Sequence, residues 1–179
     1  MPRISVERTY LQLTEPPLGV PSAADDTSAS NGRDLLRIEE ECACSVATYR
    51  ALYAAVGADY HWRDRLTWSD EMLAGHLART DVRVWILRDA DGVGGYFELA
   101  KGSDEAVEIA YFGLIPSRHG RGLGKVLLTR AIAEAWGWGA ARVWLHTCTL
   151  DGPAALPNYL ARGFVPFRRE PYEVTIPGD

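Results

Sequence analysis

The sequence predicts an α/β (α+β) domain built on a mixed, mostly antiparallel central sheet with helices on both faces. Apolar residues alternate with a period of two in three consecutive segments between residues 82 and 114, which predicts an antiparallel meander. From about residue 122 onward helical and strand patterns alternate, which is typical of βαβ units. A chain that combines both kinds of connection forms a mixed sheet.

The composition fits one globular domain over residues 1–179. The chain is 47% apolar and 24% charged, with a net charge of -5 and no run of Lys and Arg, which argues against nucleic acid or an anionic membrane as partner. No apolar run approaches the ~20 residues that span a bilayer, and the N-terminus lacks a signal-peptide core. The three cysteines have no zinc-site spacing. We therefore expect a reduced, cytoplasmic protein without a metal.

The first half of the chain contains two helices and one clear strand. Residues 4–13 alternate loosely and predict a strand, whereas residues 14–32, rich in Pro, Ser and Asp, predict a mobile surface loop. Residues 34–40 fit either a helix start or a short strand, and we favour the strand. An apolar face predicts a helix over 45–56, and Ser69 is placed to cap a helix that reaches about residue 79.

The second half supplies most of the sheet. Tight turns with Gly separate the three strands of the meander, and a Gly-rich loop separates the meander from the first βαβ helix. The expected elements are strands at 82–88, 93–99 and 107–114, a helix at 122–138, a strand at 142–147, a helix at 153–162 and a strand at 164–170.

The loop over residues 116–124 has three alternate glycines and joins a buried strand to a helix. Glycines let the backbone approach a ligand closely, and the free N–H groups of a helix N-terminus hold anions, most often phosphate. A Walker A loop needs Ser or Thr after its Lys, but Lys125 is followed by Val126. A dinucleotide fingerprint needs Gly-x-Gly-x-x-Gly, and the spacing here is Gly-x-Gly-x-Gly.

Charge around this loop also favours an anion site. No acid lies between Glu108 and Glu134, whereas that interval holds Arg118, Arg121, Lys125 and Arg130. The alternative is that the glycines only form a tight turn and the bases line a solvated helix face. The strand–loop–helix context favours the anion site.

The loop sequence His119-Gly120-Arg121-Gly122-Leu123-Gly124 resembles the acetyl-CoA-binding motif of the GCN5-related N-acetyltransferases (GNAT). The stretch from Asn158 to Phe164 resembles the family's later signature, a Tyr five residues before the Phe of Gly-Phe. The order of elements agrees over about residues 82–170. His119 replaces the usual Arg or Gln, and Pro157 falls inside the later helix, where an interior position costs about 3 kcal/mol.

The resemblance implies a GNAT-like sheet that splays after a bulge in the strand before the Gly-rich loop. It also implies acetyl-CoA as co-substrate, with the backbone of residues 113–115 pairing with its pantetheine arm and donating to the oxyanion. The residues carried over as cofactor-binding are Leu114, Ile115, His119, Gly120, Arg121, Gly122, Leu123, Gly124 and Lys125.

Direct transfer to an amine needs a base and an acid for the leaving thiol. Glu108, a lone acid on an apolar strand, lies eleven residues before His119, a spacing similar to that of the catalytic glutamate in histone-acetylating members. Its alternative is a solvent-facing position, with Tyr111 and its other apolar neighbours on the opposite face. The resemblance makes Tyr159 the acid, and its alternative is a half-buried tyrosine with a hydrogen-bonded hydroxyl.

The acceptor pocket is expected from aromatic and acidic residues outside the loop, because an aromatic wall beside a carboxylate suits a cationic amine. The candidates are Trp62, Asp64, Trp68, Phe97 and His146. The alternative for Trp62 and Trp68 is packing around a loop, for His146 a core position and for His119 a place on the loop surface. The resemblance implies an acetyl-CoA-dependent N-acetyltransferase that acts on a primary amine of a small molecule or peptide, and it is compatible with a homodimer. The alternative is a non-catalytic acyl-CoA-binding sensor or interaction module.

Overall fold

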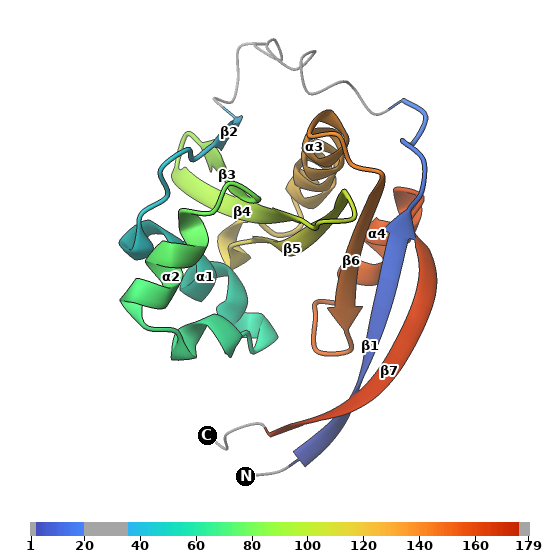
Figure 1. Ribbon diagram of the computed structural model, residues 1–179. Coiled ribbons are helices and arrows are strands. Elements are labelled where there is room, and N and C mark those ends of the chain that lie inside the picture. Colours follow the sequence, from blue (N-terminus) through green and yellow to red (C-terminus); the bar gives the residue numbers. More distant parts are fainter. Residues whose placement is uncertain (1–2, 20–35, 176–179) are drawn as a thin grey trace.

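A computed structural model describes residues 3–19 and 36–175. It contains one seven-stranded sheet in the order β2-β3-β4-β5-β6-β1-β7 (Figure 1). The strands are β1 Arg3–Leu13, β2 Arg37–Glu40, β3 Val82–Asp89, β4 Gly92–Lys101, β5 Ala106–Leu114, β6 Arg142–Cys148 and β7 Val165–Thr175. Every neighbouring pair is antiparallel except β5 and β6, which run parallel. The predicted mixed, mostly antiparallel sheet is confirmed.

Helices cover both faces of this sheet, as the sequence predicts. Two of them, α1 (Val46–Gly57) and α2 (Asp70–Leu77), pack on β3, β4 and β5 from one side, and two more, α3 (Leu123–Gly137) and α4 (Ala155–Ala161), lie on the other side (Figure 1). Each side has its own apolar core. None of the helices in the described part of the chain is long and apolar enough to cross a membrane.

The starts of α1 and α2 agree with the sequence prediction, and a serine caps each of these helices. The Ser45 hydroxyl accepts the Thr48 N–H at the start of α1, and the Ser69 hydroxyl accepts the Met72 N–H at the start of α2. The ambiguous segment 34–40 forms β2 over its last residues. The predicted loop at 14–32 falls largely outside the described residues.

Pro157 lies at the third position of α4 because this helix begins at Ala155 and not at residue 153. The first four N–H groups of a helix have no partner within the helix, so a proline in the first turn removes no helical hydrogen bond. The interior cost expected from the sequence therefore does not apply.

A bulge at Ala110 changes which side chains of β5 share a face. Glu108 pairs with Ala100 and Tyr111 pairs with Glu98, so the strand has one residue more than β4 between these pairs. Ala100 and Glu98 alternate regularly on β4 and point to one side. Glu108 and Tyr111 therefore lie on the same face, the side of α1 and α2, which corrects the expectation that they lie on opposite faces.

Beyond Glu108, β5 and β6 part. Their parallel pairing consists of three residue pairs and ends where Glu108 faces Trp144. From that point β5 continues toward the Gly-rich loop beside β4 alone (Figure 1). The predicted splay of the strand before the Gly-rich loop is confirmed.

Phe97 belongs to the core beneath α3 and not to an acceptor pocket. Its side chain is fully buried and stacks on Trp85, with ring centroids 5.0 Å apart. The prediction that Phe97 contacts the acceptor is therefore wrong, since the neighbouring residue Glu98 occupies the side of α1 and α2.

We expect Phe97→Ala to lower the free energy of unfolding by about 3–5 kcal/mol, because it leaves a large cavity in a packed core. Urea unfolding followed by circular dichroism measures the change. Phe167→Ala on β7, where the ring is 44% exposed, is the matched control and should cost less than about 1 kcal/mol. Equal losses in the two variants would contradict the assignment of Phe97 to the core.

Candidate active site

The Gly-rich loop is shaped by two glycines in the left-handed region. Gly120 has φ +73° and Gly122 has φ +76°, and an added Cβ at either position would meet nothing within 4 Å. Their conformation, and not a lack of space, therefore calls for glycine. Across residues 3–19 and 36–175, no group accepts a hydrogen bond from the backbone N–H groups of residues 120–124. These amides at the start of α3 form a cradle suited to an anion.

Leu123 and Gly124 connect this cradle to the rest of the fold. Leu123 is the first residue of α3 and packs against the core on that side of the sheet. The Gly124 carbonyl accepts a hydrogen bond of 3.3 Å from the Asn158 side-chain amide on α4. The position of the loop is therefore tied to both helices of this face.

The basic residues near the loop are only partly available to a ligand. Arg118 is buried and donates to both carboxylate oxygens of Asp89, at 2.6 and 2.9 Å. Arg121 also lies 3.9 Å from Asp89, and Arg130 pairs with Glu134. The hydrogen bonds from Arg118 hold the pKa of the Asp89 carboxyl below its usual value.

From the sequence we expected no acid near the basic residues of the loop. Asp89, at the end of β3, lies beside Arg118 and Arg121 and corrects this expectation. Lys125 has no ion-pair partner in the described part of the chain and lies exposed in the first turn of α3. It is therefore the cation best placed to meet a bound anion.

His119 is turned toward the end of β5. Its Nε2 atom lies 3.1 Å from the Leu114 carbonyl oxygen and 3.3 Å from the Tyr60 hydroxyl. The Tyr60 ring also packs against Gly152, where a Cβ would lie 3.1 Å from the ring. Tyr60 was not predicted, and it links the α1 side of the molecule to the loops on both sides of the splay.

The main chain at the end of β5 has two different environments. The Ile115 N–H donates to the Gly94 carbonyl at 2.9 Å, and the Ile115 carbonyl accepts from the Arg118 N–H at 2.9 Å. The Ile115 backbone is therefore already satisfied, contrary to its expected role. Because alternate residues of a strand point their polar groups to opposite edges, Phe112 and Leu114 direct theirs away from β4 and into the splay.

Glu108 lies half-buried on the face of α1 and α2, at the point where β5 and β6 part. Burial raises the pKa of its carboxyl to about 7, and the nearby Glu98 carboxylate adds to the increase while Arg65 opposes it. The Nε2 atom of His146, on β6, lies 4.0 Å from the Glu108 Oε1. A carboxyl with a pKa near neutrality can both accept and release a proton under physiological conditions.

Glu98 anchors the surroundings of Glu108. Its carboxylate is fully buried and accepts hydrogen bonds from the Tyr49 hydroxyl, from Arg65 Nη2 at 3.1 Å and from His76 Nε2 at 2.8 Å. The Arg65 guanidinium lies 4.0 Å from the centroid of the Trp68 ring. The network therefore fixes the segment that carries the predicted acceptor residues.

Trp62, Asp64 and Trp68 come together on the same side of the sheet. The Asp64 carboxylate accepts hydrogen bonds from the hydroxyls of Tyr53, at 2.5 Å, and Tyr111, and the Trp62 ring lies 5.1 Å from the Tyr111 ring. Burial alone would raise the pKa of Asp64, but the two phenol hydrogen bonds outweigh it and lower this pKa. The carboxylate is therefore charged at neutral pH.

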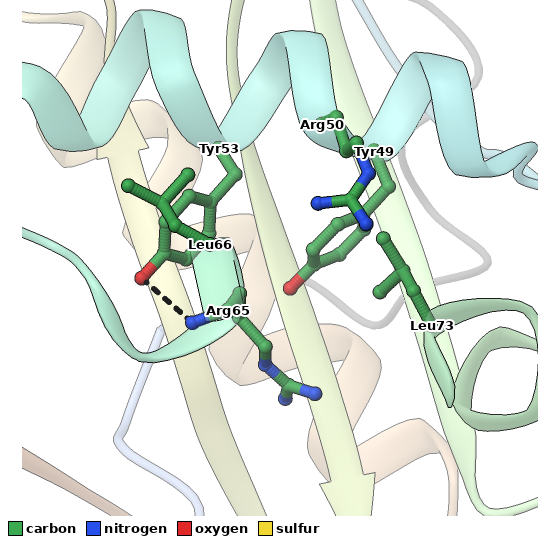
Figure 2. A pocket seen from close by; sticks show the side chains of 6 residues that line it. All are labelled: Tyr49, Arg50, Tyr53, Arg65, Leu66 and Leu73. Carbon is green, nitrogen blue, oxygen red and sulfur yellow. Dashed lines mark hydrogen bonds between the residues drawn. The ribbon is translucent and has the colours of Figure 1, made fainter. Parts of the chain in front are cut away.

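A small cavity of about 10 Å³ lies beside this cluster (Figure 2). It is lined by Tyr49, Arg50, Tyr53, Arg65, Leu66 and Leu73. Ligand pockets typically measure about 300–1,000 Å³, so this cavity is too small for a nucleotide cofactor. In the described ranges no group of three or more His, Cys, Asp or Glu side chains could hold a metal ion.

Tyr159 lies on the opposite side of the splay from Glu108. It is buried in the core under α3 and α4, with its ring 6.1 Å from both Phe112 and Phe164. Burial raises the pKa of its hydroxyl well above the usual value. The phenol is therefore protonated at neutral pH and able to donate.

Comparison with known proteins assigns the family. Residues 47–164 match the acetyltransferase (GNAT) family, which is more than half of the chain, and the chain belongs to this family. A 68-residue segment is 41% identical to uncharacterized N-acetyltransferases of Mycobacterium bovis and Mycobacterium tuberculosis. The segment covers 37% of this chain and 44% of each relative, so less than half the length of these curated relatives is matched.

Solved structures share the fold. A GNAT family acetyltransferase of Streptococcus pneumoniae superposes with a TM-score of 0.55 and 21% identity, over 73% of this chain and 88% of its own. An aminoglycoside acetyltransferase from an uncultured soil metagenomic sample, solved with sisomicin, gives a TM-score of 0.61 and 16% identity, over 72% and 87%. At these identities the likeness shows the fold alone.

We expect Gly122→Ala to weaken binding of CoA at least tenfold, because a left-handed residue with a side chain costs about 1–2 kcal/mol and the loop would leave its present conformation. Titration calorimetry with CoA measures the affinity. Gly75→Ala is the matched control, since Gly75 lies in α2 with open space around it. It should stabilise the fold by about 0.5–1 kcal/mol and leave CoA binding unchanged. Wild-type affinity in Gly122→Ala would contradict the role of the cradle.

Proposed function

We propose that the chain transfers the acetyl group of acetyl-CoA directly to a primary amine of a small molecule or peptide. The observation that carries the proposal is the arrangement at the two ends of the splayed part of β5. One end leads into an anion cradle at the N-terminus of α3, and the other holds a carboxyl group, that of Glu108, with a pKa of about 7. Membership of the acetyltransferase family supports this reading.

The residues of the loop fit acetyl-CoA. The unpaired amides of residues 120–124, with Lys125 beside them, suit the pyrophosphate. The outward main-chain groups of Phe112 and the outward Leu114 N–H suit the pantetheine amides, while the Leu114 carbonyl bonds to His119. The bound co-substrate supplies the acetyl group as a thioester. An outward N–H of this strand is placed to stabilise the oxyanion, a donor typically worth about 3–4 kcal/mol of the barrier.

Glu108 acts as the base in this proposal. A primary amine with a pKa of about 10 arrives mostly as the ammonium, which cannot attack a carbonyl. A carboxylate whose pKa lies near 7 removes that proton more readily than an ordinary glutamate does. Tyr159, protonated and on the other side of the splay, holds a proton at its hydroxyl for the departing thiolate.

The acceptor lies in this proposal against the face that carries Trp62, Asp64, Trp68 and His146. Two carboxylates beside aromatic rings favour a cationic ligand. A fold neighbour is named an aminoglycoside acetyltransferase, and its structure contains sisomicin. That neighbour supports a substrate with primary amines as a class, without selecting one.

The alternative function is an acyl-CoA sensor without catalysis, and the departures from the family pattern at His119 and Pro157 would favour it if they disrupted the site. Pro157 lies in the first turn of α4 and His119 bonds to Leu114, so neither disrupts the site. The functional test measures CoA release from acetyl-CoA across a panel of primary amines. Tight binding of acetyl-CoA without turnover of any amine would favour the sensor over the enzyme.

We expect Glu108→Gln to lower kcat about 10²–10³-fold, because the amide cannot take up the proton of the ammonium. The wild-type rate should rise through about pH 7 as Glu108 loses its proton. The variant should retain only the pH dependence of the amine itself. A full rate and an unchanged pH profile in the variant would remove Glu108 from the mechanism.

The same substitution has an opposite effect on stability. The pKa of Glu108 is raised from 4.5 to about 7 on folding, so the stability due to its bound proton is present below pH 4.5 and is lost as the pH rises through 7. Glu108→Gln should therefore raise the free energy of unfolding at about pH 8, by at most about 3 kcal/mol, and change it little at about pH 4. Urea unfolding at both pH values measures the difference.

Tyr159→Phe is expected to lower kcat about tenfold to a hundredfold, because the leaving thiolate loses its proton donor while the ring remains in the core. The wild-type rate should show no fall from Tyr159 ionisation up to about pH 10, since burial raises the pKa of this hydroxyl. Tyr172→Phe on β7 serves as the control and should leave the rate unchanged. An unaltered rate in Tyr159→Phe would assign the proton to another donor.

A further inference from the structure

Glu108 and His146 face each other across the point where β5 and β6 part. The last pair of the parallel ladder joins Glu108 to Trp144, and His146 lies two residues further along β6 on the same face as Trp144. The His146 Nε2 and Glu108 Oε1 atoms are 4.0 Å apart. Two proton-carrying side chains from separate strands thus meet at the splay.

The two side chains differ in their access to solvent. The Glu108 side chain is 24% exposed and the His146 side chain is 38% exposed. An acceptor lying against Glu108 would cover much of the exposure of that carboxyl. His146, on the strand further from α1 and α2, would border the acceptor and keep part of its exposure to water.

We propose that His146 takes the proton that Glu108 removes from the acceptor ammonium and releases it to solvent. The inference rests on the proposed function, in which Glu108 is the base. The N–H bond of the ammonium breaks and an O–H bond forms on Glu108. That O–H bond then breaks as an N–H bond forms on His146 Nε2, and the imidazolium finally loses its proton to water. Both residues return to their starting states and no redox partner is needed.

The geometry requires one small adjustment. A separation of 4.0 Å exceeds hydrogen-bond length, and a side-chain rotation or one intervening water closes it. The Tyr10 ring on β1 lies 5.7 Å from the imidazole and supports it from the far side. His146 acts through Glu108, so it is a positioning residue and not a catalytic one.

The pKa of His146 lies below that of Glu108, so the imidazole holds the proton only in transit and its release to water completes the transfer. Desolvation and the Arg8 guanidinium lower the pKa of His146, while Asp151 and Asp64 oppose them. Burial raises the pKa of Glu108. Glu98, on β4, raises this pKa further, and Arg65, in the segment after α1, lowers it. The imidazole is therefore neutral at pH 7 and its Nε2 can accept a proton.

The first experiment measures coupling between the two groups in the free protein. His146 is titrated by NMR in the wild type and in Glu108→Gln. We expect the imidazole resonances of His146 in the wild type to shift as the pH passes through about 7, where Glu108 loses its proton, and we expect this step to be absent in the variant. An identical titration in the two proteins would overturn the relay, whatever the activity measurements show.

The second experiment tests the transfer with acetyl-CoA and the amine that the panel shows to be turned over fastest. His146→Ala should lower kcat at pH 7 about tenfold to a hundredfold, and added imidazole should restore at least part of the loss. His146→Asn keeps a polar side chain but cannot titrate, so we expect the same loss without rescue. The double variant His146→Ala/Glu108→Gln should not respond to imidazole, since the base is missing.

The outcomes separate this inference from the proposed function. Turnover by the wild type with a normal rate in His146→Ala overturns the relay alone. A loss in His146→Ala that imidazole does not restore assigns His146 a structural role and also overturns the relay. An absence of turnover with every amine overturns the proposed function and the relay with it.

Discussion

Between Ile109 and Tyr111, β5 carries one residue more than the strand opposite it, and both halves of the candidate site follow from this extra residue. The bulge turns Tyr111 to the side of α1 and α2, where its hydroxyl reaches Asp64. It also bends β5 away from β6, so that Phe112 and Leu114, which still pair with β4, have no neighbouring strand on the side of β6. A regular strand would pair with β6 along its length and close the gap between the two faces.

A second constraint fixes the segment that faces this gap. A fully buried carboxylate is stable only with close partners, and Glu98 finds them in Tyr49, Arg65 and His76, which come from three different elements. Loss of one partner would leave a charge in the core. The position of the turn that carries Asp64 is thus set by the interior of the protein and not by its surface.

The sequence was sufficient for the elements and for the Gly-rich loop, because periodicity, serine caps and glycine spacing are local properties. The sequence could not predict contacts between segments far apart in the chain. It also could not predict which face a side chain takes in a strand that is buried on both faces. Residues 94–99 are buried on both faces of β4 and include the charged Glu98, so their pattern could not show that Phe97 lies under α3. The pairing of Arg118 with Asp89 spans 29 positions, and it changes the charge balance that the loop sequence suggested.

The same Arg118–Asp89 contact links the anion cradle to the turn between β3 and β4. Both side chains are 9% exposed, and the turn itself consists of Ala90, Asp91 and Gly92 at the surface. Such turns ordinarily accept inserted sequence. Here an insertion at Ala90 or Asp91 would displace the carboxylate that holds Arg118, and with it the entry to the Gly-rich loop. A tag or fusion partner is therefore better joined elsewhere, because this exposed turn is part of the support of the Gly-rich loop.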